Sequence, residues 1–318
     1  MGRITRRGLL TAATFAATVR AQDAAMRLAA AGPGSAFLAF AEAVAPMVER
    51  RVRIRLEPVR TGGSNENARL VSAGQVPFGL LNMGPGADAW NGRGPFAAGR
   101  LRGMRAVAPM YETPFAVLAL RRSGITTLRG LDGKRVGVGP AGGPGEVFFA
   151  GLQEAIGLRG AKVVTGTPAE LGEAVLRGEL DAFWYGAGLP APPFADVARR
   201  AEAVVFGFQP DEAAAFRTKF DYFTPYDIPA LTYAGQDAPV ASVAVWNFVV
   251  AHEAVPDDVA GRLAQALIEG ADELAGTFPA AVAMRAMNLD ANRVLPWHPG
   301  AAAYYRGAGV TLPPVPAN

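Results

Sequence analysis

One pattern of short apolar segments, glycine-rich breaks and helical spacings occurs twice along the chain, and it constrains the fold more than any other feature of the sequence. The longer segments repeat apolar residues at helical spacing, and the shorter ones are apolar runs bounded by glycine and proline. The first copy predicts strands at 26–31, 52–59 and 78–81 and helices at 36–50 and 65–72. The second copy predicts strands at 135–138 and 162–164 and helices at 146–156 and 168–176, and it closes on a strand at 181–185.

An alternation of strand, loop and helix is typical of an α/β fold with a mainly parallel sheet covered by helices. Because the order recurs, we expect two similar lobes with a cleft between them, and a glycine-rich loop near the start of each lobe. The first lobe is predicted at 22–113 plus 209–318 and the second at 114–208.

Four further segments are expected to connect and complete the lobes. Residues 104–120 are rich in strand formers and are predicted to pass from one lobe to the other, and 208–240 to bring the chain back. A strand at 242–251 and a long helix at 257–278 then belong to the first lobe. The strand's apolar run is interrupted by Asn247 and is too short to span a bilayer, so no membrane span is expected.

The N-terminal residues 1–21 are predicted to be an export signal. Paired arginines, Arg6 and Arg7, precede a short apolar stretch at 8–19, and small residues around Ala21 offer a cleavage point. A twin-arginine signal fits best, with a Sec signal as the alternative. Four arginines precede Gln22 with no acidic residue among them, so removing these charges from the net +3 of the chain leaves −1. The expected location is the periplasm, and nucleic acid is not an expected partner.

Several catalytic classes are excluded by residue content. The chain has no cysteine, so disulfides, thiolate metal sites and cysteine nucleophiles are excluded. Its two histidines, His252 and His298, lie after a predicted strand and before a predicted helix, where we expect turn or capping roles. No nucleophile-elbow or metalloprotease motif occurs, and the carboxylates Glu146, Glu179 and Asp181 are not spaced as a catalytic pair. We expect neither an enzyme nor a cofactor or metal.

Two glycine-rich loops are the strongest candidates for a binding site. Residues 139–146 and 61–67 each lie between a strand and a helix, where free N–H groups and the helix dipole favour an anion. Each loop also has a plainer interpretation: residues 139–146 can serve packing alone, and Ser64 or Asn65 in residues 61–67 can cap a helix. If both loops face one cleft, they can hold a small ligand through its carboxylate, with aromatic side chains as walls. The candidate ligand-binding residues are Gly34, Ser35, Gly63, Ser64, Asn65, Asn82, Tyr111, Gly142, Gly143, Gly145, Glu146, Trp184, Tyr185 and Tyr226.

A series of motifs occurs in a specific order along the chain. The motifs are Thr61-Gly62-Gly63-Ser64, Ser72-Ala73-Gly74-Gln75, Leu131-Asp132-Gly133-Lys134, Gly178-Glu179-Leu180-Asp181-Ala182-Phe183, Gly188-Leu189-Pro190-Ala191-Pro192, Tyr233-Ala234-Gly235-Gln236 and His298-Pro299-Gly300-Ala301. Together they resemble the TAXI branch of the solute-binding proteins that serve tripartite ATP-independent periplasmic (TRAP) transporters. The resemblance implies a type II periplasmic-binding fold, in which a solute is held between two lobes and presented to separate membrane permease subunits. Related members bind glutamate, glutamine or other small carboxylates.

The chain departs from this family at expected ligand positions. Asn82-Met83-Gly84 stands where the family usually has Gln-Ser-Asp, and Phe37-Leu38 where a tyrosine pair is common. Gly143-Pro144-Gly145 replaces a hydroxyl-bearing Ser-Gly-Thr type sequence. These changes predict a pocket that is less polar than in glutamate-binding members.

The sequence therefore supports an exported, monomeric binding protein that closes by hinge motion over a small carboxylate-bearing solute, namely an amino acid, a 2-oxoacid or a dicarboxylate. Two alternatives stay open at this point. One is a ligand-sensing protein that delivers its ligand to a membrane receptor, and the other is an enzyme on the same scaffold that uses Glu146 or Asp181.

Overall fold

The computed structural model describes residues 25–314, and the predicted export signal lies outside this range. The strands are β1 (Met26–Ala29), β2 (Leu56–Val59), β3 (Phe78–Asn82), β4 (Met104–Leu120), β5 (Arg135–Gly137), β6 (Lys162–Val164), β7 (Ala182–Gly186), β8 (Ala203–Phe206), β9 (Thr224–Ile228) and β10 (Val240–His252). The helices are α2 (Ala36–Val52), α3 (Ser64–Ser72), α4 (Met83–Asn91), α5 (Pro144–Ile156), α6 (Pro168–Arg177), α7 (Pro192–Arg200), α8 (Pro210–Lys219), α9 (Asp257–Glu269), α10 (Ala271–Ala275) and α11 (Pro299–Gly307).

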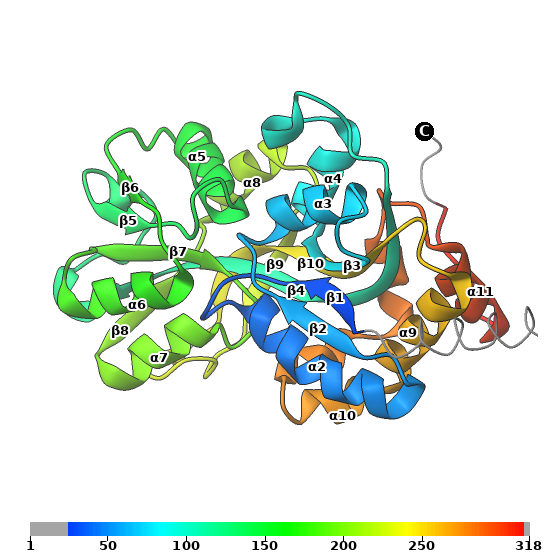
Figure 1. Cartoon of the computed structure of the whole chain (residues 1–318). Helices are drawn as coiled ribbons and strands as arrows, with labels where there is room; N and C mark the ends of the chain where they lie inside the picture. The colour runs from blue at the N-terminus through cyan, green and yellow to red at the C-terminus, as the bar shows by residue number, and fades with distance from the viewer. Residues whose placement is uncertain (1–24, 315–318) are drawn as a thin grey trace, which may run out of the picture.

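The strands form one mixed sheet that runs through two bodies. Its order is β2-β1-β3-β10-β4-β7-β5-β6, with β8 also paired to β4 and β9 to β10. Strands β1, β2 and β3 pair in parallel in one body, and β5, β6 and β7 pair in parallel in the other. The long antiparallel pair β4 and β10 lies between the two sets and joins the bodies (Figure 1). The predicted α/β class and the crossing strand at 104–120 are confirmed.

Helices cover both faces of this sheet. One hydrophobic core lies under α2, α6, α7 and α9 to α11, and the other under α3, α4, α5 and α8. The division agrees with Figure 1, where these two groups of helices lie on opposite sides of the strands. Each face therefore has a core that continues from one body to the other.

The C-terminal end of α2 differs from the prediction. The helix extends to Val52 and is closed by Arg53, which has the left-handed φ of 55° and donates its N–H to the Glu49 carbonyl. The following strand, predicted from residue 52, therefore begins only at Leu56. Local hydrogen bonding at the helix end overrides the alternating apolar pattern of residues 52–56.

The predicted long helix at 257–278 is two helices, α9 and α10, which meet at Gly270. A Cβ atom at Gly270 would lie 2.3 Å from Sδ of Met47 in α2 and 2.6 Å from the carbonyl of Ala266. The break thus allows α2 to pack closely against this corner. Helical spacing alone did not reveal the break, although a glycine within a helical pattern is a local signal for one.

Residues just after the predicted second lobe pack on that lobe. The ring of Phe220, which follows α8, lies 5.2 Å from that of Phe148 in α5, and Phe216 lies 5.0 Å from Phe220. The lobe boundaries at 113/114 and 208/209 stay predictions. None of the helices in the described range is both long and apolar enough to cross a membrane.

Candidate functional site

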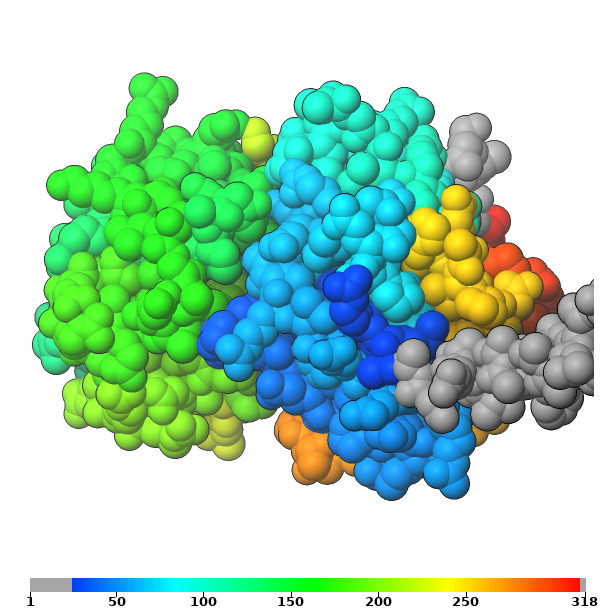
Figure 2. Space-filling model, in the orientation of Figure 1, coloured from blue at the N-terminus to red at the C-terminus, as the bar shows by residue number. Residues whose placement is uncertain are grey.

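A cavity of about 100 Å³ lies where the two bodies meet. Their surfaces are in contact on the face shown in Figure 2. The cavity lies beyond the carboxyl ends of β1, β3 and β5, the place where open α/β sheets bind ligands. Its lining residues are Ala31, Gly32, Ser35, Ala36, Phe37, Gly62, Gly63, Ser64, Asn82, Tyr111, Thr113, Phe115, Val138, Gly139, Pro140, Pro144, Gly145, Pro168, Tyr185, Gly186, Ala187 and Asn247.

The first glycine-rich loop ends in a helix without a side-chain cap. Gly63 is the N-cap of α3, with a φ of 96°, and neither Ser64 nor Asn65 caps the helix. Instead, Oγ of Ser64 accepts a hydrogen bond of 3.0 Å from the Asn82 amide. Since the structure gives no acceptor within its described range for the N–H groups of Ser64 and Asn65, they are available to a ligand.

The second loop has the same construction. Gly143 is the N-cap of α5 and no side chain caps this helix, so the N–H groups of Gly145 and Glu146 have no acceptor among the described residues. A Cβ atom at Gly145 would lie 2.2 Å from the carbonyl of Val138, which requires glycine there. In both loops a glutamate accepts a 2.6 Å hydrogen bond from the glycine amide four residues earlier, Glu66 from Gly62 and Glu146 from Gly142.

Three other helices that begin at the cavity have caps. Ser35 accepts a hydrogen bond of 3.1 Å from the Leu38 amide of α2, and Asn82 accepts one of 3.1 Å from Gly84 of α4. Thr167 and Glu170 form a reciprocal capping box at α6. The helices α3 and α5, which follow the two glycine-rich loops, thus differ from these three helices in lacking side-chain caps. The partial positive charge at the N-termini of α3 and α5 suits an anion.

The two loops touch across the junction. Nδ2 of Asn65 donates a hydrogen bond of 2.5 Å to the carbonyl of Gly142. Gly34 lies so close to α6 that a Cβ atom on it would be 2.9 Å from Cβ of Ala169. Contacts between the bodies therefore border the cavity.

Part of the cavity lining is a buried polar network centred on Asn247 of β10. Nδ2 of Asn247 donates to Oγ1 of Thr113 at 2.6 Å and to the Tyr111 carbonyl at 2.8 Å, and its Oδ1 accepts from Nδ2 of Asn82 at 3.2 Å. The register between β10 and β4 shifts between Trp246 and Phe248, so β4 has one extra residue opposite Asn247. Bulges of this kind often redirect side chains at functional sites.

Two tyrosines complete the lining. The hydroxyl of Tyr111 is buried and has no hydrogen-bond partner in the described residues. Burial raises the pKa of Tyr111 well above its ordinary value, and burial also raises the pKa of Tyr185, whose hydroxyl lies beside the Ala36 amide. Both hydroxyls are therefore neutral hydrogen-bond donors at physiological pH.

Charged side chains are absent from the cavity lining in the described part of the chain. The carboxylate of Glu146 accepts a hydrogen bond from its own loop, and Asp181 forms an ion pair of 2.8 Å with Arg135. This ion pair lowers the pKa of Asp181 and keeps it ionised. Within residues 25–314, no three histidine, aspartate or glutamate side chains are grouped to hold a metal. The arrangement can bind and orient a ligand, but it does not bring an acid–base pair to the cavity.

The predicted ligand-binding residues fall into three groups. Those that line the cavity are Ser35, Gly63, Ser64, Asn82, Tyr111, Gly145 and Tyr185. Those that form or join the surrounding loops are Gly34, Asn65, Gly142, Gly143 and Glu146. Those that lie elsewhere are Trp184 and Tyr226.

Trp184 was expected in the cleft wall beside Tyr185, but it is buried in the opposite core. Successive residues of a strand point to opposite faces of the sheet, so Tyr185 lines the cavity while Trp184 packs in the other core, with its ring 5.9 Å from that of Phe149. Tyr226 is half-buried and borders a different hollow with Glu112. Burial raises the pKa of Glu112, and the Tyr226 pKa is raised by burial and by the charge of Glu112.

Sequence reasoning missed Thr113, Phe115 and Asn247. An asparagine inside the apolar run at 241–250 was a usable signal, because a buried amide in a strand needs polar partners. The prediction used it only to argue against a membrane span. The positions of Thr113 and Phe115 were not accessible in the same way, because they depend on the register of β4 and its bulge.

Solved structures with the same architecture are binding proteins. MatC from Rhodopseudomonas palustris with bound malate matches with a TM-score of 0.57 and 13% identity over 81% of this chain and 88% of that one. An ancestral arginine-binding protein bound to arginine matches with a TM-score of 0.51 and 14% identity over 81% and 96%. The GluR0 ligand-binding core from Nostoc punctiforme in complex with L-glutamate matches with a TM-score of 0.50 and 13% identity over 80% and 96%.

Two lobes, a sheet crossed by β4 and β10 and a cavity between the lobes define a type II periplasmic-binding-protein fold. The chain belongs to the NMT1-like family, whose model matches residues 28–309. The fold that the sequence resemblance implied is confirmed.

Proposed function

We propose that this protein is an extracytoplasmic solute-binding protein that captures a small carboxylate-bearing solute between its lobes. The observation that carries the proposal is the convergence of two uncapped helix N-termini, one from each glycine-rich loop, on one cavity. Unsatisfied N–H groups together with the helix dipoles favour a carboxylate at this position.

Hinge closure is the expected mode of capture. The bodies are joined by β4 and β10, and the Asn65–Gly142 hydrogen bond connects the loops on either side of the cavity. A ligand that contacts both α3 and α5 stabilises the closed arrangement over an open one, because only the closed arrangement offers both sets of N–H groups.

The partner we propose is the membrane permease of a TRAP-type secondary transporter. Support comes from the ordered motifs that resemble the TAXI branch and from membership of the NMT1-like family. Together with the predicted signal at residues 1–21, the proposal is that the mature protein acts as a monomer in the periplasm and delivers its solute to the permease subunits.

A thermal-shift screen of amino acids, 2-oxoacids, 2-hydroxy acids, short fatty acids and dicarboxylates tests the proposal. A bound carboxylate raises the melting temperature by mass action and lowers the radius of gyration in small-angle scattering. No shift with any member of the panel contradicts solute binding of this class. Binding without compaction contradicts only the hinge closure.

A further inference from the structure

We propose that the solute is a compact monocarboxylate without a cationic group, of about six or fewer non-hydrogen atoms, such as a short 2-hydroxy or 2-oxo acid. This inference rests on the proposed function and narrows its ligand class. It excludes amino acids and dicarboxylates, which the family resemblance leaves open. Cavity size, cavity charge and the spare hydrogen-bond donors of the lining carry it.

The first argument is size. The cavity measures about 100 Å³. An apolar protein cavity of about 150 Å³ accommodates benzene, so a smaller cavity holds about six or fewer non-hydrogen atoms. Lactate and pyruvate fit that limit, whereas malate and glutamate exceed it. The contacts of Asn65 with Gly142 and of Gly34 with Ala169 prevent the cavity from widening without separation of the lobes.

The second argument is charge. The N–H groups at α3 and α5 match one carboxylate, and no lining side chain in the described range offers a cation to a second one. An ammonium group has no carboxylate partner either, because Glu66 and Glu146 are engaged by their loop amides and do not line the cavity. A buried charge without a partner is strongly unfavourable.

The third argument is the polarity of the remaining lining. The hydroxyl of Tyr111 has no hydrogen-bond partner among the described residues. The hydroxyl of Thr113 accepts a hydrogen bond from Asn247 but can still donate its own hydrogen. The side-chain amide of Asn82 donates one hydrogen to Asn247 and has a second one to donate. These spare donors suit a hydroxyl or keto oxygen next to the carboxylate. An ammonium group can donate to the hydroxyl oxygens as well, so the lack of a carboxylate partner, and not these hydroxyls, disfavours it.

Calorimetric titration of the purified full chain with isosteric ligands provides the test. L-lactate and L-alanine differ only in a hydroxyl in place of an ammonium, and succinate adds a second carboxylate. We expect lactate or pyruvate to bind at least ~100-fold more tightly than alanine or succinate, as expected for an unpaired buried charge.

The outcomes separate the two proposals. Alanine, glutamate, malate or succinate binding as tightly as lactate overturns this inference and leaves the proposed binding function standing. No binding of any of these ligands contradicts the proposed function itself and the inference with it.

A variant tests the size argument separately. Phe37 lines the cavity and is only half-buried, so Phe37→Ala enlarges the cavity with little disturbance of the core. We expect the ratio of pentanoate affinity to lactate affinity to be at least ~10-fold higher in the variant than in the unaltered protein. An unchanged ratio in a variant with a native circular-dichroism spectrum contradicts size selection by this cavity.

Discussion

Two buried tyrosine hydroxyls show how differently the same group acts at different positions. The hydroxyl of Tyr305 donates a hydrogen bond of 2.8 Å to the Val107 carbonyl and so connects α11 to β4. The hydroxyl of Tyr111 borders the cavity and is buried without any partner in the described residues. A buried polar group without a partner destabilises the unliganded protein, which is understandable if a ligand satisfies it.

We therefore predict opposite effects for two matched substitutions. Tyr111→Phe leaves the melting temperature unchanged or raises it, while it weakens ligand binding by about 10-fold. Tyr305→Phe lowers stability by ~1 kcal/mol, because it leaves a carbonyl unpaired, and does not change ligand affinity. Denaturant unfolding and calorimetric titration of both variants measure the two effects, and a Tyr111→Phe variant with full affinity contradicts a ligand contact.

The two histidines have the structural roles that the sequence predicts. Nδ1 of His298 accepts the Gly300 amide at 3.3 Å as the N-cap of α11, and Nδ1 of His252 accepts the Ala254 amide in a turn. His298 is fully buried, and burial lowers its pKa below the ordinary 6.5, although the nearby Asp257 opposes the shift. A histidine that must accept a hydrogen bond is held neutral in the folded protein.

This lowered pKa predicts a pH dependence of stability. As the pH falls, the unfolded chain takes up a proton at His298 near pH 6.5, before the folded protein does. The contribution of His298 to the free energy of unfolding is therefore complete above that pH and is lost as the pH falls toward the folded pKa. We expect His298→Asn, which keeps a cap acceptor but does not titrate, to flatten the dependence of the melting temperature between about pH 7 and 5. The same slope of melting temperature against pH in the variant and in the unaltered protein contradicts the assignment of this pH dependence to His298.

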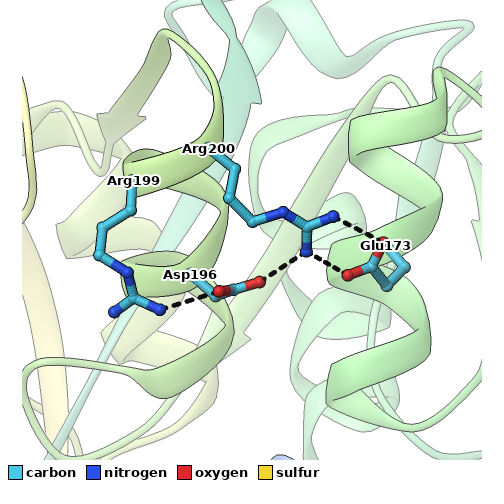
Figure 3. Close-up of polar contacts among 4 residues, drawn as sticks. All are labelled: Glu173, Asp196, Arg199 and Arg200. Atoms are coloured by element: carbon cyan, nitrogen blue, oxygen red, sulfur yellow. Dashed lines mark hydrogen bonds and ion pairs between the residues drawn. The ribbon is translucent and has the colours of Figure 1, made fainter.

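At the scale of elements, the helices that begin at the cavity differ in how their first amides are satisfied. Helices α2, α4 and α6 satisfy their first amides with side chains, whereas α3 and α5 leave theirs open at the cavity. Away from the cavity, α6 and α7 are joined by a surface network in which Arg200 binds Glu173 and Asp196, and Asp196 also binds Arg199 (Figure 3). This network ties the two helices together on the outside of the second body.

The network predicts a stability contribution that depends on pH and salt. Hydrogen bonds from Arg200 lower the pKa of both Glu173 and Asp196. A carboxyl whose pKa is lower in the folded protein than in the unfolded chain stabilises the protein at a pH above its unfolded pKa. This stabilisation is lost as the pH falls through the folded pKa. We expect Arg200→Met to lower the melting temperature slightly at pH 7 in low salt, with the difference vanishing below about pH 3 and in high salt. A difference that persists in acid contradicts an ionic origin.

At the scale of the whole molecule, one sheet and two continuous cores connect bodies that meet at small loop contacts. The strands β4 and β10 carry the connection, and the loops at Gly34, Asn65 and Gly142 close the cavity. In the proposed mechanism, opening separates these loop contacts while β4 and β10 keep the bodies joined. The ligand then acts as an additional contact between the bodies.

Removal of a loop contact should shift this equilibrium. We expect Asn65→Ala to raise the radius of gyration of the unliganded protein and to weaken ligand binding about 5-fold, in line with the loss of one hydrogen bond. Asn288→Ala is the matched control, because Asn288 donates to the Ala283 carbonyl away from the cavity. Identical scattering of the two variants with and without ligand contradicts a closing role for Asn65.

Much of the architecture was predictable from the sequence because it depends on local chemistry. Apolar periodicity and glycine breaks predicted most strands and helices, including β4 and β6 to the residue, and the histidine roles followed from their positions at element ends. The helix break at Gly270 was missed although a glycine within a helical pattern is a local signal for one, whereas the close approach of Met47 to Gly270 is visible only in the structure.

The sequence by itself determined most of the strands and that two glycine-rich loops precede helices, but it did not reveal α4, α7, α8, β8 or β9. Only the tertiary structure decided which of the loop amides are free, because Ser64 could cap α3 but instead accepts from Asn82, eighteen residues later in the chain. It also decided which aromatics reach the cavity, since the register of β4 with β10 and the alternation of β7 turn Tyr185 inward and Trp184 away. Local patterns specify conformation, but the partner that a side chain finds depends on contacts between segments distant in sequence.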